Sequence, residues 1–117
     1  MNKPKCPEYF DIEFGKKLIE YVGVDTSLIE DYECWYQFSK KFFHLKEKAE
    51  KYFEKCLELK EGNVSQAAYL MCYHQISSRT WAEKIIKKCN DSKYAFLMYL
   101  DCGSSRDWYE NIKSKSE

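Results

Sequence analysis

The side chains of this sequence best suited to chemistry belong to six cysteines and two histidines. A cysteine thiolate can act as a nucleophile, bind a metal or form a disulfide, and the spacing of the residues decides among these uses. No pair has the Cys-x-x-Cys spacing of zinc sites and redox motifs, and most of the cysteines lie in apolar stretches, where Cys behaves as a small buried hydrophobe. The sequence therefore predicts reduced core thiols in preference to disulfides, and no metal. The positions are Cys6, Cys34, Cys56, Cys72, Cys89 and Cys102.

Cys72 and His74 come closest to a nucleophile with its base. Two residues apart on a helix, however, side chains point about 200° away from each other and do not share a proton. His44 stands between Phe43 and Leu45, where a partly buried structural histidine is expected. No glycine-rich phosphate loop occurs in the sequence. We therefore expect no enzyme activity and no cofactor.

The charges of the chain balance. Lysine and arginine together number 19, as do aspartate and glutamate, so the formal net charge is zero. A neutral chain has no global field that attracts nucleic acid or anionic lipid. A neutral chain can still carry a local patch of positive charge. The alternative function is therefore nucleic-acid binding through a face of lysines and aromatic residues, which predicts a steep salt dependence of the affinity. The lysines expected on that face are Lys40, Lys41, Lys46, Lys48 and Lys51.

Aromatic residues are numerous, with ten tyrosines, seven phenylalanines and three tryptophans. Positions 35, 38, 42 and 45 follow helical spacing and are expected to form a buried stripe. Tyr36 and Phe43 then remain to face outward, beside Lys40 and Lys41. Such residues suit either a stacking surface for single-stranded nucleic acid or a hot spot for a protein partner.

An internal repeat organises the C-terminal half of the chain. Residues 63–88 and 90–115 align without a gap at an offset of 27 and share twelve of 26 positions. A period of this length fits one pair of short antiparallel helices and is typical of a helical solenoid. The matches include Trp81 with Trp108, and Arg79 with Arg106. The sequence therefore predicts two consecutive helix-turn-helix units.

A degenerate earlier copy is traced over residues 25–56. Its two halves align with the next copy at offsets that differ by five residues, which predicts an insertion near residues 40–44. Residues 7–22 place apolar side chains at helical spacing and predict an amphipathic helix that caps the array. The predicted fold is a single all-α domain over residues 1–117, a small α-solenoid-like array of about six or seven helices. Its parts are the capping helix 7–22, the degenerate repeat 25–56, and the repeats 63–89 and 90–115.

Capping boxes are predicted at the second helices of the repeats 63–89 and 90–115, and at the start of the degenerate repeat. Thr80 and Asp107 each precede a tryptophan and stand three residues before a glutamate, as an N-cap with its N3 partner does. Ser27 repeats the pattern in the first copy. The first helices of the units, over residues 67–73 and 94–100, are apolar on nearly every side and are expected to be buried between neighbours.

Arg79 and Arg106 are the most suggestive polar residues, since each stands at the same position of its repeat. In one interpretation, each guanidinium stacks on the nearby tryptophan or bridges to a carboxylate of the adjacent unit. In the other, both lie on one edge of the array and bind acidic groups of a partner. Tyr109 replaces Ala82 of the preceding copy and is a further candidate for a partner or homodimer contact.

The segments Trp-Ala-Glu-Lys-Ile-Ile at 81–86 and Asp-Ser-Lys-Tyr-Ala-Phe at 91–96 resemble the degenerate HEAT-like helical repeats of uncharacterised phage and bacterial proteins. The resemblance covers residues 63–115 best and implies an α-solenoid with a binding role and no catalytic residues. Small helical phage proteins include inhibitors of bacterial defence systems, such as anti-CRISPR proteins. By analogy, we expect a phage-encoded inhibitor that occupies the surface of a host protein.

No apolar run approaches the roughly 20 residues of a membrane span, and the first residues lack the apolar region of a signal peptide. We therefore expect a cytoplasmic protein without a membrane partner, in the host cytoplasm if it is phage-encoded. The repeat and the lack of a catalytic motif favour a module that binds another protein. The candidate contact residues are Arg79, Arg106, Tyr36, Phe43, Lys40, Lys41 and Tyr109.

Overall fold

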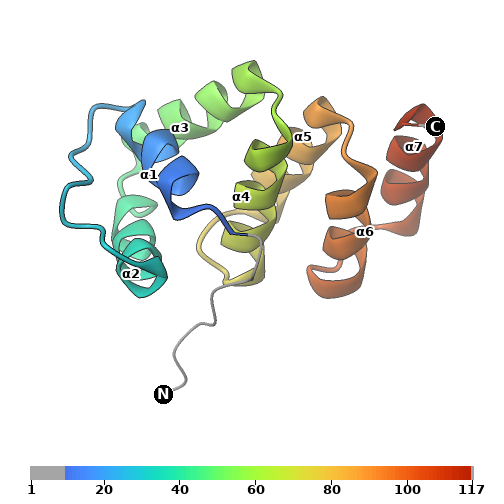
Figure 1. Ribbon diagram of the computed structural model, residues 1–117. Helices are drawn as coiled ribbons and strands as arrows, with labels where there is room; N and C mark the ends of the chain where they lie inside the picture. Colours follow the sequence, from blue (N-terminus) through green and yellow to red (C-terminus); the bar gives the residue numbers. More distant parts are fainter. Residues whose placement is uncertain (1–9, 117) are drawn as a thin grey trace. The chain divides into compact units, whose positions relative to one another are not determined.

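The computed structural model describes residues 10–116. This part of the chain holds seven α-helices and no strand, which confirms the predicted all-α helical array (Figure 1). The chain divides into two compact units, residues 1–55 and residues 56–117. The first unit contains α1 (Ile12–Glu20), α2 (Tyr32–Phe42) and most of α3 (Lys46–Leu59), which ends in the second unit.

Helix α1 is the predicted N-terminal helix, shortened at both ends. It begins at Ile12 because the Asp11 carboxylate accepts hydrogen bonds from the amides of Glu13 and Phe14 and so caps the helix. It ends at Glu20, shortly before Gly23, whose φ of 79° suits glycine and stops a helix. Of the predicted span, residues 7–9 lie outside the described part of the chain.

Aromatic rings fill the core of the first unit. Trp35 is 1% exposed, and its ring centroid lies 5.0 Å from that of Phe10 and 5.6 Å from that of Tyr32. Gly15 of α1 lies against the same indole, since a Cβ added to Gly15 would come 2.7 Å from Trp35 Nε1. Only a residue without a Cβ lets α1 approach α2 this closely.

The predicted start of α2 and the predicted insertion are both wrong. Ser27 lies in a turn, and α2 begins at Tyr32 because Asp31 accepts a hydrogen bond from the Cys34 amide at 2.9 Å and caps the helix there. Helix α2 runs to Phe42 and α3 begins at Lys46, so no insertion separates the two helices. The longer connection lies ahead of α2, in the loop 21–31.

The short turn after α2 exposes two residues that were expected to be buried. Leu45 is 52% exposed, although its spacing from Trp35 and Phe42 puts it on their stripe. His44 is also exposed. Helical spacing stops predicting burial at the residue where the helix ends, because the chain then changes direction.

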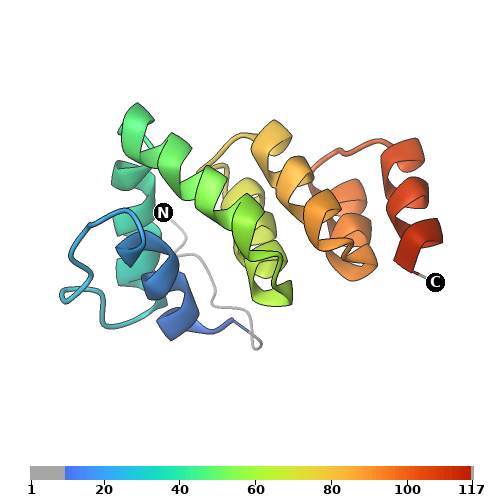
Figure 2. The same ribbon diagram turned by 90° about the horizontal axis from the view of Figure 1, so that it is seen from above.

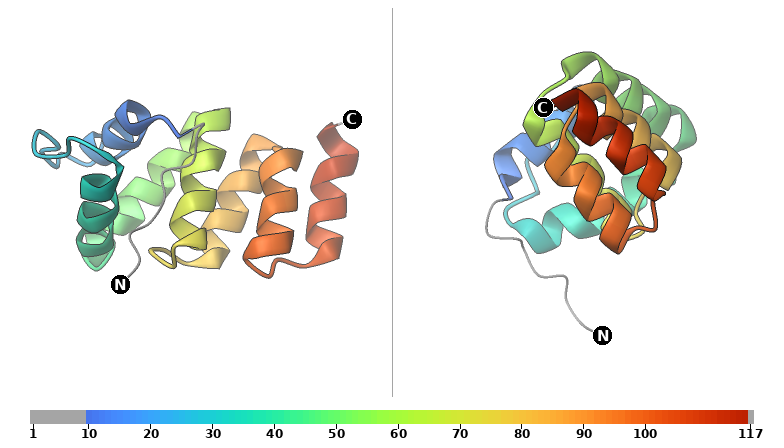
Figure 3. Two further views of the ribbon diagram at one scale, coloured as in Figure 1. Left: turned by 60° about the horizontal axis from the view of Figure 1, so that its bottom comes forward. Right: turned by 90° about the vertical axis from the view of Figure 1, so that its right-hand side faces the viewer.

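The second unit consists of two antiparallel helix pairs. They are α4 (Gly62–Tyr73) with α5 (Arg79–Cys89), and α6 (Ser92–Asp101) with α7 (Arg106–Ser116). Figures 2 and 3 show these four helices side by side in chain order. Helices α5 and α7 begin and end 27 residues apart, which confirms that the sequence period is a structural period.

Helices α5 and α7 begin two residues earlier than predicted, because their caps are Ser78 and Ser105 in place of Thr80 and Asp107. The Ser78 hydroxyl accepts a hydrogen bond from the Thr80 amide, and the Ser105 hydroxyl accepts one from the Trp108 amide, each at 3.2 Å. Both capping-box assignments are therefore wrong in register. Thr80 and Asp107 lie inside the first turn, where the negative charge of Asp107 favours the positive end of the helix dipole.

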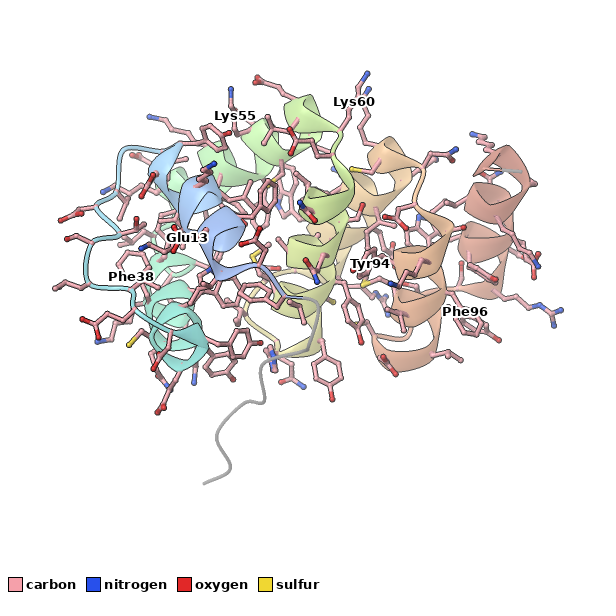
Figure 4. All side chains as sticks on the ribbon, viewed as in Figure 1. Glu13, Phe38, Lys55, Lys60, Tyr94 and Phe96 are labelled. Atoms are coloured by element: carbon pink, nitrogen blue, oxygen red, sulfur yellow. The ribbon has the colours of Figure 1, made fainter. Side chains whose placement is uncertain are left out.

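The burial expected for residues 67–73 is correct for 67–71 of α4, whereas Cys72 is half-buried and Tyr73 is 52% exposed. The burial expected for residues 94–100 is half correct for α6. Residues 64–71 of α4 are all buried. On α6, Tyr94 is buried, and its ring centroid lies 5.9 Å from that of Tyr69 on α4. Phe96 and Leu100, on the other side of α6, are 42% and 59% exposed. Figure 4 shows Tyr94 and Phe96 on opposite sides of the helix.

Candidate interaction site at the helix turns

Arg79 lies in the first turn of α5, and its side chain contacts the next repeat. Its Nη1 donates a hydrogen bond to the Gly103 carbonyl in the α6–α7 turn, 3.0 Å away. Its Nε lies 3.5 Å from Glu83 Oε1, and the same oxygen accepts a hydrogen bond from the Ser104 hydroxyl at 2.7 Å. Gly103 has a φ of 76°, so the turn that presents its carbonyl to Arg79 favours glycine.

Arg106 repeats this geometry one unit later. Its Nε lies 3.7 Å from Glu110 Oε1, as Arg79 lies beside Glu83. Its side chain is 75% exposed, against 55% for Arg79. Within the described residues, no turn carbonyl accepts a hydrogen bond from Arg106 in the way that Gly103 does from Arg79. The guanidinium of Arg106 therefore presents donors to solvent.

Exposed apolar side chains accompany the two arginines. Tyr73 and Leu100 occupy equivalent positions, 27 residues apart in the last turns of α4 and α6, and are 52% and 59% exposed. In an antiparallel pair, the end of one helix lies beside the start of the next, so these residues share an edge with the starts of α5 and α7 (Figure 1). We call this surface the turn edge: Tyr73, Arg79, Phe96, Leu100 and Arg106.

An open hollow of about 470 Å³ lies at the turn edge. The Ser77 hydroxyl oxygen is buried there and has no hydrogen-bond partner in the described part of the chain. Two cysteines, Cys72 from α4 and Cys102 from the end of α6, line the same hollow. The complete lining is Cys72, Tyr73, Gln75, Ser77, Ser78, Arg79, Thr80 and Cys102.

The sequence pattern paired Cys72 only with His74 and did not indicate that Cys102 lines the same hollow as Cys72. The available signal was the repeat itself, because stacked units place the ends of their first helices next to one another. The expectation of buried thiols fits Cys56, whereas Cys72, Cys89 and Cys102 are partly exposed and Cys34 is exposed. All five of these described cysteines are unpaired by disulfides.

Tyr109 packs against α6. Its ring centroid lies 5.8 Å from that of Tyr99 in a stacked arrangement, and 5.3 Å from that of Phe96. The ring therefore covers part of the side of α6, whereas Ala82, at the equivalent position of α5, is 1% exposed. Tyr109 is half-buried and contacts the ring of Phe96, and its contact with a partner stays a prediction.

The remaining predicted contact residues belong to the first unit and form a separate candidate site. Lys40 and Lys41 are exposed near the end of α2, and Lys40 Nζ lies 5.5 Å from the centroid of the Tyr36 ring. Phe43 is half-buried, and its ring centroid lies 5.0 Å from that of Tyr52. Phe43 therefore belongs to the margin of the aromatic core.

Lysines gather on the second unit as well. A hollow of about 410 Å³ is lined by Leu57 and four lysines. Helical spacing brings the three lysines of α5 to it, and the last comes from α7. The lysines are Lys84, Lys87, Lys88 and Lys115. The five lysines expected on one face are all exposed, and all lie in α2 and α3.

The fold and the turn edge together define a class, an all-α helical array with arginines and apolar side chains exposed at its turns. Comparison of the chain with protein-family models, curated proteins and solved structures found no match. Within residues 10–116, no helix is both long enough and apolar enough to cross a membrane.

Proposed function

We propose that this chain is a protein-binding helical module that engages its partner through the turn edge. The observation that carries the proposal is the exposed guanidinium of Arg106, on the same edge of the helix pair as the exposed Leu100. In the preceding unit, Arg79 holds the carbonyl of a helix turn at 3.0 Å. Arg106 has the equivalent glutamate neighbour, Glu110, and no turn carbonyl within the described residues, so its guanidinium can hold a carbonyl or carboxylate of a partner in the same way. Arginine and aromatic residues are enriched among the residues that dominate binding energy at protein interfaces.

The HEAT-like resemblance of residues 63–115 supports the same proposal, because helical repeats present extended binding surfaces. A narrower form of the proposal is that the chain is phage-encoded and inhibits a bacterial defence protein by covering its surface. This form requires a single protein partner in stoichiometric amount in a bacterial lysate.

Affinity capture from bacterial lysate with matched variants tests the proposal. The variant Leu100→Ser/Arg106→Gln changes the two most exposed residues of the turn edge and is expected to lose the partner. The control Lys87→Gln/Lys88→Gln changes exposed residues outside the turn edge and is expected to retain it. Circular dichroism checks that both variants stay helical. Equal capture by wild type and Leu100→Ser/Arg106→Gln would refute the turn edge as the contact surface.

Nucleic-acid binding is the second candidate function, and the lysine-lined hollow of α5 and α7 is the observation that favours it. Under this alternative, the outcomes of the same experiment are reversed. Lys87→Gln/Lys88→Gln would lose the captured material, and nuclease treatment would release it. The affinity would also fall steeply as salt is raised. A homodimer is a third outcome, which sedimentation of the purified chain would reveal as twice the monomer mass.

A further inference from the structure

Cys72 and Cys102 lie 30 residues apart in the sequence, and the fold brings both to the lining of one hollow. Cys72 belongs to the last turn of α4, and Cys102 is the residue that ends α6. Helices α4 and α6 pack against each other, so the two side chains come from adjacent repeats, and both line the hollow at the turn edge. Small molecules in solution can therefore reach both sulfur atoms.

The surroundings of the two thiols shift their pKa values in opposite directions. The hydrogen bond from Cys102 lowers the pKa of Cys72, with a further contribution from the Arg79 guanidinium, and these effects exceed the opposing effect of burial. The same hydrogen bond and burial raise the pKa of Cys102. Cys72 is therefore the thiol that ionises first, and the thiolate is the nucleophilic form of cysteine. Cys102 keeps its proton.

Cys89 shows what the same degree of burial does elsewhere in the unit. Its thiol donates a hydrogen bond to the Glu61 carbonyl at 3.3 Å, and burial raises its pKa. Cys89 does not line the hollow. The arrangement around Cys72 is thus specific to the turn edge. Within the described residues, no group of three side chains is placed to hold a metal ion, so the pair lacks the ligands of a metal site.

We propose that Cys72 and Cys102 form an oxidation-sensitive pair, in which hydrogen peroxide oxidises Cys72 and Cys102 converts the product into a disulfide. The Cys72 thiolate attacks one peroxide oxygen, so an S–O bond forms, the O–O bond breaks, and hydroxide leaves and takes up a proton. The Cys102 sulfur then attacks the Cys72 sulfur. An S–S bond forms, the S–O bond breaks, and the hydroxide leaves with the Cys102 proton as water. Two thiols are oxidised, and one peroxide is reduced to two waters.

Ser77 and Arg79 fit this chemistry. The Ser77 hydroxyl lacks a hydrogen-bond partner in the described part of the chain, and Ser77 lines the same hollow as Cys72. The Arg79 guanidinium favours the thiolate and any anionic product. The pair is independent of the proposed binding function, because its reaction needs no protein partner.

Peptide mapping of the full chain tests the proposal. The chain is exposed to a small molar excess of hydrogen peroxide, free thiols are blocked with N-ethylmaleimide, and trypsin is added. Tryptic cleavage places Cys72 in peptide 61–79 and Cys102 in peptide 94–106. We expect these two peptides to appear as one disulfide-linked species, which dithiothreitol separates. In Cys102→Ser, Cys72 should persist as a sulfenic acid that dimedone labels, and in Cys72→Ser, Cys102 should remain a free thiol.

The controls Cys34→Ser and Cys89→Ser are expected to form the linked species as wild type does. Circular dichroism verifies the fold of each variant, and Cys72→Ala replaces Cys72→Ser if the serine variant unfolds. The proposal is overturned if peptides 61–79 and 94–106 stay unlinked in the oxidised wild type. It is also overturned if Cys34 or Cys89 is oxidised at a lower peroxide concentration than Cys72.

Discussion

Gly15 packs its backbone against the Trp35 indole, and a methyl group at position 15 has no room. In Gly15→Ala, the new Cβ would lie 2.7 Å from Trp35 Nε1 and 3.1 Å from Phe10 Cζ. Overpacking of this kind costs about 1–3 kcal/mol, whereas alanine in place of glycine favours a helix by about 1 kcal/mol. We therefore expect a net loss of stability, measured as a lower thermal midpoint.

Gly62→Ala is the matched control for Gly15→Ala. Gly62 also lies in a helix, but no atom stands within 4 Å of an added Cβ. The substitution should leave the midpoint unchanged or raise it slightly. A midpoint that rises equally in both variants would contradict the close approach of α1 to Trp35.

His74 makes the stability of the second unit depend on pH. Burial lowers the pKa of His74 from its ordinary value of 6.5. Below that value, the unfolded chain binds more protons at this residue than the folded chain does, so stability rises with pH and is lost on acidification. We expect the thermal midpoint to fall between about pH 7 and pH 5, and to fall less in His74→Gln. The exposed His44 supplies the control, and an equal fall in His74→Gln and His44→Gln would exclude His74 as the cause.

At the residue scale, the sequence located the arginines of the candidate site but not its thiols. Arg79 and Arg106 match in the gapless alignment, so the repeat itself marked them. Cys102 aligns with Gln75, and no identity pointed to it. Its proximity to Cys72 comes from the stacking of α4 on α6. Contacts between different positions of adjacent repeats require the packing as well as the period.

The starts of α5 and α7 are set by serine hydroxyls. Ser105→Ala removes the acceptor for the Trp108 amide and should destabilise the protein by about 1 kcal/mol, a typical loss for an N-cap. Ser78→Ala should have a similar effect through the Thr80 amide. Chemical denaturation measures both changes.

Thr80→Ala separates the observed caps from those that the sequence predicted. Thr80 is exposed in the first turn of α5, and alanine is the better helix former there. The substitution should therefore have little effect or be slightly stabilising. A loss of about 1 kcal/mol in Thr80→Ala, with none in Ser78→Ala, would restore the helix start predicted from the capping box.

At the element scale, periodicity predicted which segments are helical and local competition decided where they begin. Ser78 and Thr80 are both suitable N-caps, and sequence alone gives no reason to prefer the first. The predicted insertion was misplaced because an alignment of degenerate copies shows that two copies differ in length but not where the additional residues lie. The structure has the longer connection at residues 21–31. Asp31, which caps α2, fixes where that difference falls.

At the scale of the whole molecule, the chain has two compact units, each with its own type of core. Large aromatic rings dominate the first unit, around Trp35, Phe42 and Tyr52. Small and aliphatic side chains dominate the second, such as Ala68 and Ile85. Helix α3 belongs to both units, since it begins in the first and ends in the second. Whether the two units fold as the single domain predicted from the sequence therefore depends on α3, the helix that they share.

An uninterrupted α3 is expected to make the two units unfold together. The first unit holds ten residues of α3 and the second holds four, and a helical segment of either length is unstable alone. In the variant Trp81→Phe/Trp108→Phe, fluorescence reports Trp35 in the first unit, while far-ultraviolet circular dichroism reports all helices. Coincident denaturation curves are expected. Adding Glu54→Pro, which breaks α3 at an exposed position at a cost of about 3 kcal/mol, should separate the curves, and Glu54→Ala should not. Separate transitions without the proline would mean that α3 does not couple the units and that the chain folds as two domains.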